Sequence, residues 1–299
     1  MPSIDFNGIF VPMITPLNPD ESLDESGVER LVEHFIAGGV RGIFVLGTSG
    51  EGPALSLDTK IHLVRAVGRC AQGRIPVLVG VVESGTLRTI QLAERLLAEG
   101  GDAAVITAPY YFIHTQEELF QHFSTIASAL SKPLIVYNIP QMVKTVLEPE
   151  TVVRLARNPH IIGVKDSLGD MARFQRLLPI LRERADFGIH QGAEGVAALS
   201  IARGAPGATL GLANIAPRLC CDLHQAVRCG DLDTAWNLQE RLLRLWQLHT
   251  HAPWLPCLKA AASLLGLCQP TASAPFLPLS DEVKEAIRGD LAAAGVIHP

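Results

Sequence analysis

The chain has 299 residues, of which 48% are hydrophobic, and its 25 basic and 30 acidic side chains give a net charge of −5. This length fits two domains or one large α/β barrel, and the apolar content is ample for a core, so we expect unaided folding. The charges are scattered without long runs, which excludes a nucleic-acid or anionic-membrane binder and favours a small-molecule partner, and no apolar run approaches the roughly 20 residues of a membrane span.

The cysteines predict a reducing compartment. They form no CxxC pair and no disulfide framework, and no signal peptide precedes the first expected strand. Reduced thiols of this kind are typical of a cytoplasmic protein. The residues concerned are Cys70, Cys220, Cys221, Cys229, Cys257 and Cys268.

Short apolar runs alternate with longer amphipathic segments along most of the chain. The alternation predicts a (β/α)8 TIM barrel rather than two open sheets, because eight strand and helix pairs fit this length. The glycines of residues 47–52 also lack the order of a dinucleotide-binding fingerprint. The expected strands are 8–14, 43–46, 77–81, 103–107, 134–137, 161–165, 187–190 and 208–212, and the expected helices are 26–37, 57–71, 86–98, 117–130, 149–156, 174–181, 196–202 and 219–228.

Three further helices are expected after the barrel, at residues 231–248, 254–265 and 281–294. Proline-rich turns separate them. We therefore divide the chain into a barrel that carries the active site, residues 1–230, and a C-terminal helical region, residues 231–299. The extra helices either cover the flank of the barrel or meet another subunit.

The expected strand 161–165 runs straight into a lysine. Lys165 shares a face with Gly163, which we expect to leave room for it. Among the six lysines only Lys165 ends a buried strand, whereas others, such as Lys259, lie in ordinary helical patterns. A lysine taken out of water favours its neutral form, the nucleophile that makes a Schiff base with a carbonyl compound. The alternative is a lysine that reaches solvent or pairs with Asp166.

Other polar residues follow the carboxyl ends of the strands, where barrel enzymes carry their chemistry. The segment 47–52 follows the second strand, and all three tyrosines, Tyr110, Tyr111 and Tyr137, fall at strand ends. Two tyrosine hydroxyls linked through Thr48 could relay a proton beside an imine, although each tyrosine taken singly is better explained as an aromatic cap on the rim. The glycines of 47–52 either permit positive φ or let backbone N–H groups reach a carboxylate.

These motifs resemble those of the dihydrodipicolinate synthase and N-acetylneuraminate lyase family of class I aldolases and lyases. The resemblance covers essentially the whole chain and implies the family's barrel, its Schiff-base mechanism without a cofactor, and a homo-oligomer, either a dimer or the usual tetramer. It rests on Gly47-Thr48-Ser49-Gly50-Glu51, Pro109-Tyr110-Tyr111, Tyr137-Asn138-Ile139-Pro140 and Gly163-Val164-Lys165-Asp166.

The resemblance also assigns roles to individual residues. It implies that Lys165 forms the imine with pyruvate or a related 2-oxo acid, and that Tyr137 shuttles the proton at the reacting carbon. Thr48 and Ser49 would hold the substrate carboxylate, and Tyr111 looks like the relay tyrosine that a neighbouring subunit supplies. Two further positions align with the lining of the pyruvate pocket, Gly192 and Thr209.

An imine is a cationic electron sink, so a carbon–carbon, carbon–nitrogen or carbon–oxygen bond beside it can be made or broken without a metal or cofactor. A metal-dependent aldolase is a weaker interpretation, because His249 and His251 stand two residues apart in a helical stretch and do not face one ion. A barrel that binds an oxo acid without turnover is the alternative from another class. The presence of Lys165, Tyr137 and Thr48 together argues against it.

The second substrate stays open among sugar-derived oxo acids, hydroxylated oxo acids, and compounds that are deaminated or dehydrated. In dihydrodipicolinate synthase proper, an arginine two residues beyond the strand-five proline grips the carboxylate of aspartate semialdehyde. Here Met142 takes that position, and Lys144 is a flexible point charge that would not reproduce a bidentate grip. We therefore predict a lyase acting on another 2-oxo acid, with the synthase itself as the alternative.

Overall fold

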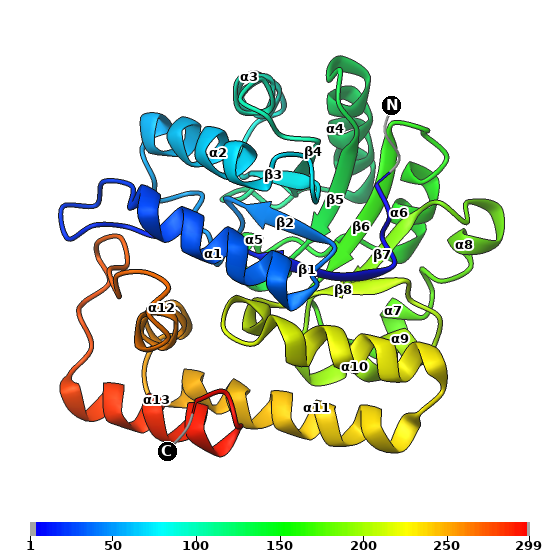
Figure 1. The fold of residues 1–299 in the computed structure, drawn as a ribbon. Helices are drawn as coiled ribbons and strands as arrows, with labels where there is room; N and C mark the ends of the chain where they lie inside the picture. Colours follow the sequence, from blue (N-terminus) through cyan, green and yellow to red (C-terminus); the bar gives the residue numbers. More distant parts are fainter. Residues whose placement is uncertain (1–3, 298–299) are drawn as a thin grey trace.

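The strands close into a single parallel barrel. The computed structural model describes residues 4–297, and in it eight strands pair in chain order, with β8 returning to β1 (Figure 1). The expected (β/α)8 TIM barrel is confirmed. The strands are β1 (Gly8–Pro12), β2 (Gly42–Val45), β3 (Val77–Val81), β4 (Ala103–Thr107), β5 (Leu134–Asn138), β6 (Ile161–Asp166), β7 (Gly188–Gln191) and β8 (Gly207–Thr209).

Amphipathic helices surround the barrel because each has one apolar stripe to bury. Several begin at a side-chain cap, as the sequence would favour: Asp24, Ser56 and Thr115 each accept a hydrogen bond from a first-turn backbone N–H. The helices are α1 (Glu25–Gly38), α2 (Leu57–Ala71), α3 (Thr86–Leu97), α4 (Gln116–Ala129), α5 (Pro140–Val143), α6 (Pro149–Leu155), α9 (Ala197–Ala202) and α10 (Pro217–Cys229), with a short 3-10 turn, η1 (Glu194–Val196), before α9.

The predictions of two elements were wrong. The helix expected at 174–181 is instead two short helices, α7 (Met171–Phe174) and α8 (Ile180–Glu183). Pro179 explains the break, because proline has no N–H to donate and its ring clashes with the preceding turn. The strand expected at 208–212 ends at Thr209, and a 3-10 turn, η2 (Gly211–Asn214), follows. The buried Glu194 carboxylate accepts hydrogen bonds from the backbone N–H groups of that turn.

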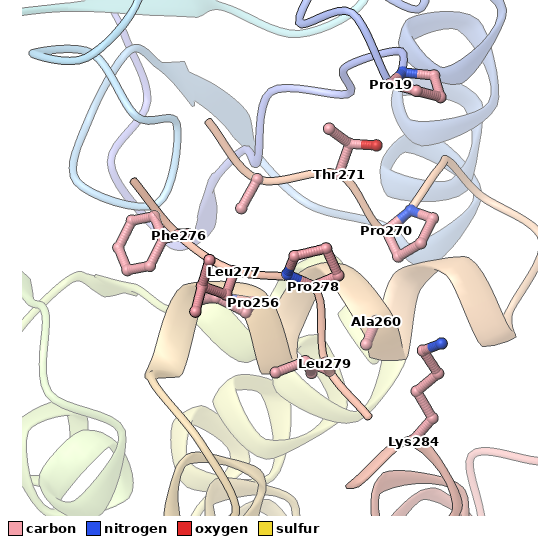
Figure 2. Close-up of a pocket in the computed structure, with 11 residues that line it drawn as sticks. Pro19, Pro256, Ala260, Pro270, Thr271, Phe276, Leu277, Pro278, Leu279 and Lys284 are labelled. Carbon is pink, nitrogen blue, oxygen red and sulfur yellow. The ribbon is translucent and has the colours of Figure 1, made fainter. Parts of the chain in front are cut away.

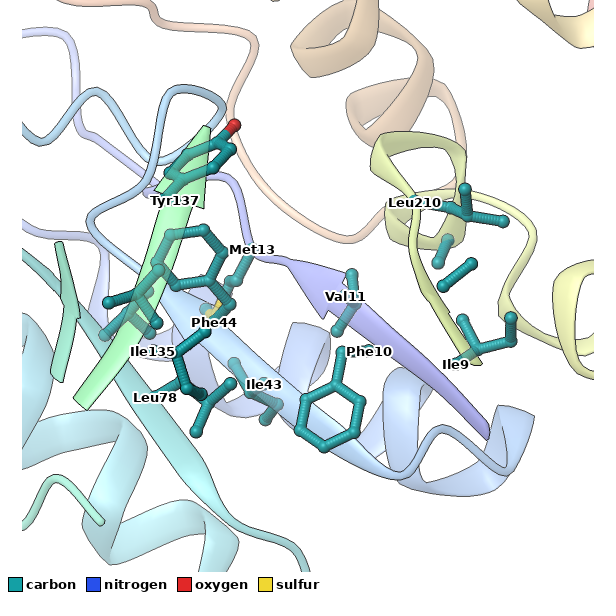
Figure 3. Packing of buried hydrophobic residues seen from close by; sticks show 14 of the residues in the cluster. Ile9, Phe10, Val11, Met13, Ile43, Phe44, Leu78, Ile135, Tyr137 and Leu210 are labelled. Carbon is teal, nitrogen blue, oxygen red and sulfur yellow. The ribbon is translucent and has the colours of Figure 1, made fainter. Parts of the chain in front are cut away.

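The inside of the barrel is filled by apolar and aromatic side chains (Figure 3). Phe10 stacks on Phe6, with ring centroids 5.9 Å apart, and meets the edge of His190 at 5.0 Å. At the other end of this row, Tyr137 packs edge-on against Phe44 at 5.8 Å. The core thus supports a tyrosine from below while its hydroxyl faces the carboxyl ends of the strands.

The C-terminal helices lie against one flank of the barrel (Figure 1). They are α11 (Leu232–Trp246), the 3-10 turn η3 (Gln247–Thr250), α12 (Trp254–Leu264) and α13 (Asp281–Ala293). Helix α12 is buried on nearly all sides, and the segment 270–279 crosses over it, enclosing a small apolar pocket of about 230 Å³ (Figure 2). Within residues 4–297, no helix combines the length and the apolar character that crossing a membrane requires.

Candidate active site

Lys165 lies inside the barrel at the carboxyl end of β6. Its side chain is only 6% exposed, and its Nζ donates a hydrogen bond to Tyr137 Oη at 3.1 Å. Asp166, the next residue of the strand, turns to the other face, where its carboxylate accepts from Asn138 Nδ2 at 2.7 Å and from the Leu168 N–H at 3.0 Å. Burial raises the pKa of the Asp166 carboxyl. The alternatives of a lysine reaching solvent or pairing with Asp166 were therefore wrong.

The room for Lys165 comes from a glycine other than the expected one. A Cβ on Gly163 would meet the Gly188 carbonyl oxygen of the neighbouring strand at 2.9 Å, so Gly163 serves close strand packing. A Cβ on Gly192 would come within 3.0 Å of Lys165 Cε and 2.0 Å of Ser167 Oγ. Gly192, after β7, therefore lies directly beside the lysine side chain, as its assignment to the pocket requires.

Strand register places four polar side chains in one layer at this end of the barrel. Thr107 pairs with Tyr137, Tyr137 with Lys165, and Lys165 with His190 across β4 to β7. Paired residues of parallel neighbours face the same side, so all four point inward. The layer places an amine, a phenol, a hydroxyl and an imidazole side by side.

His190 is neutral at ordinary pH and fixes the position of Thr209. Burial lowers the pKa of His190 to about 4. Its Nε2 lies 2.8 Å from the Phe6 carbonyl oxygen, which can only accept, so Nε2 carries the proton. Nδ1 then accepts from the Thr209 hydroxyl at 2.9 Å. Thr209 thus lies beside the layer with its hydroxyl engaged by His190.

The loop after β2 is held in a compact turn that presents Thr48 and Ser49. The Glu51 N–H donates to the Thr48 carbonyl at 3.2 Å, and Thr15 Oγ1 donates to the Gly50 carbonyl at 2.6 Å. A Cβ on Gly50 would meet the Met13 carbonyl oxygen at 2.9 Å. Positive φ falls instead on Leu46 and Glu51. The idea that the glycines supply positive φ was wrong: they permit close backbone contact.

A second buried lysine holds this loop to the C-terminal helices. Lys259 of α12 is 0% exposed, pairs with the Glu51 carboxylate and donates to the Thr271 carbonyl at 2.5 Å. Glu51 Oε2 also accepts from the Ser273 N–H at 2.6 Å. Burial lowers the pKa of Lys259. The interpretation of Lys259 as an ordinary helical lysine was wrong, and its apolar surroundings in 254–265 were the available signal.

Tyr111 does not contact Lys165 of its own chain. It projects from the loop after β4 with 81% of its surface exposed, and its backbone has φ of 80°. Phe112 and Ile113 beside it are also exposed. A loop that holds a non-glycine residue at positive φ and exposes apolar side chains to solvent is typical of a functional site.

A pocket of about 350 Å³ opens beside the layer. It is formed by the segments after β2, β3 and β5 and by the end of β4, together with the start of α12 and the segment that covers it. Its lining residues are Thr48, Glu51, Pro53, Ala54, Val82, Thr107, Ile139, Met142, Val143, Pro253, Trp254, Leu255, Ser273 and Phe276.

The histidines considered as metal ligands are used elsewhere. His251 Nε2 contacts the Asp290 carboxylate at 2.8 Å, and His249 Nδ1 contacts the Trp246 carbonyl oxygen. Over the range 4–297, histidine, cysteine and acidic side chains form no group of three that could hold a metal ion. The two histidines therefore do not face a common point.

Known proteins resemble this chain in both sequence and fold. The family model of the dihydrodipicolinate synthetase family matches residues 5–294. The 4-hydroxy-tetrahydrodipicolinate synthase of Acidiphilium cryptum is 36% identical over 293 residues, which cover 98% of this chain and 99% of that protein.

Two solved structures have nearly the same fold. A monomeric dihydrodipicolinate synthase variant has a TM-score of 0.94 at 28% identity, over 99% of each chain. A prophage protein of the dihydrodipicolinic acid synthase family from E. coli K12, solved in complex with pyruvate, has a TM-score of 0.93 at 27% identity, over 98% of this chain and 99% of that one.

Proposed function

Because the chain belongs to the dihydrodipicolinate synthetase family, whose members are lyases and synthases, we propose that Lys165 forms a Schiff base with pyruvate or a related 2-oxo acid. The observation that carries this proposal is the buried Lys165 amine 3.1 Å from the Tyr137 hydroxyl. The complex of a related prophage protein with pyruvate supports the choice of ligand.

The reaction follows from the order of groups in the layer. Lys165 Nζ attacks the keto carbon, water is lost, and the cationic imine that results accepts the electron pair of a bond beside it. Tyr137 gives or takes the proton, and the contact of its hydroxyl with Nζ supports this role. Thr48 and Ser49 hold the substrate carboxylate, and Gly192 and Thr209 complete the wall of the site. The mechanism uses no metal and no cofactor.

The site is completed by a second subunit. Tyr111 is exposed within its own chain and belongs to an exposed apolar loop, which supports its insertion into a neighbouring site as a proton relay. A homo-oligomer, a dimer or the tetramer that the resemblance implies, follows from this role.

Borohydride trapping tests the imine. The protein is mixed with pyruvate, reduced and weighed, and the adduct is located by peptide mapping. We expect one reduced pyruvate on Lys165 and none in Lys165→Ala, while Lys60→Ala, which removes a lysine of α2, keeps the adduct. An unchanged mass, or an adduct on another lysine, would overturn the Schiff base at Lys165.

Dihydrodipicolinate synthase activity itself is the second candidate, favoured by the names of the relatives. Met142 is 60% exposed on the pocket wall, where a charged grip on a carboxylate would be needed. Losing such a bond costs about 1.5 to 3 kcal/mol. We expect a coupled assay with pyruvate and aspartate semialdehyde to give kcat/KM below about 10⁴ M⁻¹s⁻¹, and a higher value would restore the synthase assignment.

A further inference from the structure

The pocket beside the layer is apolar on almost every side. Its apolar walls include Val82 after β3, Ile139 and Met142 after β5, and Trp254 and Leu255 at the start of α12. Phe276 closes it from the covering segment and also lines the neighbouring pocket under that segment (Figure 2). A volume of about 350 Å³ is enough for an aromatic ring or a branched alkyl group.

The pocket has no free charge to offer a ligand. Of the lining residues that the structure describes, none is lysine, arginine or histidine, and Glu51 is the single charged one. The Glu51 carboxylate is already occupied by Lys259 and the Ser273 N–H. A carboxylate or phosphate entering here would lose its hydration without gaining a counter-ion, which is costly. The pocket therefore selects against an acidic group on the part of the substrate that enters it.

Two of the hydroxyls that line the pocket, those of Thr107 and Ser273, have no hydrogen-bond partner in the part of the chain that the structure describes, and Thr107 is the one beside Tyr137. Thr107 Oγ1 is buried and makes no hydrogen bond within residues 4–297. Register places Thr107 directly beside Tyr137, so this hydroxyl lies between the proton-transfer group and the apolar walls. A buried hydroxyl without a partner is unfavourable, and a hydroxyl on the ligand at this point would satisfy it.

We propose that the substrate is a 4-hydroxy-2-oxo acid whose carbon 4 carries an aryl or branched alkyl group, with that group in the apolar pocket and the 4-hydroxyl at Thr107. This inference rests on the proposed Schiff base at Lys165. The imine at carbon 2 draws the electron pair of the C3–C4 bond into an enamine, and the 4-hydroxyl loses its proton through Tyr137 as an apolar aldehyde leaves. The enamine then takes a proton at carbon 3, and water hydrolyses the imine to pyruvate and free Lys165.

A matched pair of substrates tests the pocket. 4-Hydroxy-2-oxo-4-phenylbutanoate and 4-hydroxy-2-oxoglutarate differ only in the group on carbon 4, phenyl against carboxylate, and both release pyruvate. We expect kcat/KM to be about tenfold or more higher for the phenyl compound. Equal rates, or a preference for the carboxylate or for a 2-oxo-3-deoxy sugar acid, would overturn the inference.

Two variants test whether the pocket wall determines the preference for the phenyl substrate. Met142→Arg should lower the phenyl-to-carboxylate ratio of kcat/KM by about tenfold or more, because it adds a carboxylate partner to an apolar wall. Leu87→Arg, an equally large change on the exposed face of α3, should leave the ratio unchanged. If Met142→Arg leaves the ratio where it was, the pocket does not hold the group on carbon 4.

Borohydride trapping with pyruvate alone separates this inference from the proposed function. A Lys165 adduct together with no preference for the phenyl compound overturns only the pocket assignment. Absence of the adduct overturns the Schiff base, and the substrate inference falls with it.

Discussion

Lys165 is positioned by contacts on three sides of its side chain. Gly192 leaves the space that its stem occupies, the Tyr137 hydroxyl accepts from its amine, and the Phe44 ring lies 5.0 Å from Nζ. The phenol is itself fixed by edge-on packing against Phe44. With so little freedom, the proposed nucleophile and the proposed proton-transfer group need little reorganisation before reaction.

Removing the Tyr137 hydroxyl tests its proposed role. Tyr137→Phe keeps the ring against Phe44 but loses the group that contacts Lys165 Nζ. We expect kcat to fall by about 10²-fold or more, because proton transfer at the reacting carbon loses its positioned group. A rate close to that of the unaltered enzyme would make Tyr137 a packing residue. Borohydride trapping of the variant shows whether the imine still forms.

The sequence predicted a Schiff-base role for Lys165 because a lysine at the end of a buried apolar strand is unusual. It placed Tyr137 at the carboxyl end of the fifth strand because the order of the strands is visible in the chain. It could not predict the ion pair of Glu51 with Lys259, since 208 residues of chain separate them. The unpartnered Thr107 hydroxyl was equally hidden. Threonine is common in strands, and only the register shows that this one adjoins Tyr137.

At the scale of elements, Glu51 and Lys259 join the loop after β2 to α12. The Glu51 backbone closes the turn on Thr48 while its side chain reaches the buried amine of Lys259. Lys259 also binds the covering segment through the Thr271 carbonyl. The pair therefore fixes the loop that presents Thr48 and Ser49 and the segment that closes the pocket at the same time.

Breaking the pair should affect both stability and substrate binding. Lys259→Met leaves the Glu51 carboxylate buried without its cation, so we expect the free energy of unfolding to fall by about 3 to 5 kcal/mol. The double variant Glu51→Gln/Lys259→Met should recover much of this loss in urea unfolding. Its KM for pyruvate should stay raised by about tenfold or more, because the loop is no longer fixed.

The matched control is Lys284→Met, which breaks an exposed pair with Asp281 and should change the free energy of unfolding by less than about 1 kcal/mol. If the double variant is stable and its KM for pyruvate is unchanged, the Glu51 and Lys259 pair stabilises the fold without positioning the loop that is proposed to bind the carboxylate.

His122 of α4 contacts Thr86 of α3, and protonation of His122 makes the stability of this contact depend on pH. Its Nδ1 lies 2.9 Å from Thr86 Oγ1, and burial lowers the pKa of His122 to about 4. The unfolded chain takes up this proton near its ordinary pKa of about 6.5, so the stabilising contribution is complete above that pH and is lost as the pH falls towards 4. At about pH 5 the loss amounts to about 2 kcal/mol.

Urea unfolding at about pH 7.5 and about pH 5 measures this contribution. His122→Gln should show a smaller decrease in unfolding free energy between the two conditions, because glutamine does not titrate. His62→Gln, at an exposed position of α2, should keep the decrease of the unaltered protein. An identical decrease in all three proteins would show that His122 does not control the acid sensitivity.

Element boundaries were largely predictable because apolar periodicity marks each barrel strand and helix. Each of the two failures has a physical cause. Pro179 interrupts the apolar pattern of 174–181, and the Glu194 carboxylate captures the N–H groups after Thr209 that a longer strand would use. The first signal is readable in the sequence, whereas the second requires a contact between distant segments.

At the scale of the whole molecule, contacts within a single chain do not account for the exposed apolar side chains of the loop after β4. Tyr110 and Phe112 flank Tyr111, and together with Ile113 they expose a continuous apolar run of side chains. Exposed aromatic residues on one short loop are typical of a subunit interface. A closely similar structure is that of a monomeric dihydrodipicolinate synthase variant.

Subunit mixing tests whether Tyr111 acts in a neighbouring site. Lys165→Ala has no nucleophile but carries Tyr111, and Tyr111→Phe has the nucleophile but no relay hydroxyl, so each homo-oligomer should be poorly active. When the two are unfolded together and refolded, a two-fold pair with one subunit of each kind contains one complete site. Random pairing then restores about a quarter of the sites of the unaltered enzyme. Activity that never exceeds the sum of the separate variants would show that Tyr111 does not cross between subunits, and sedimentation of the same mixture shows whether the variants associate at all.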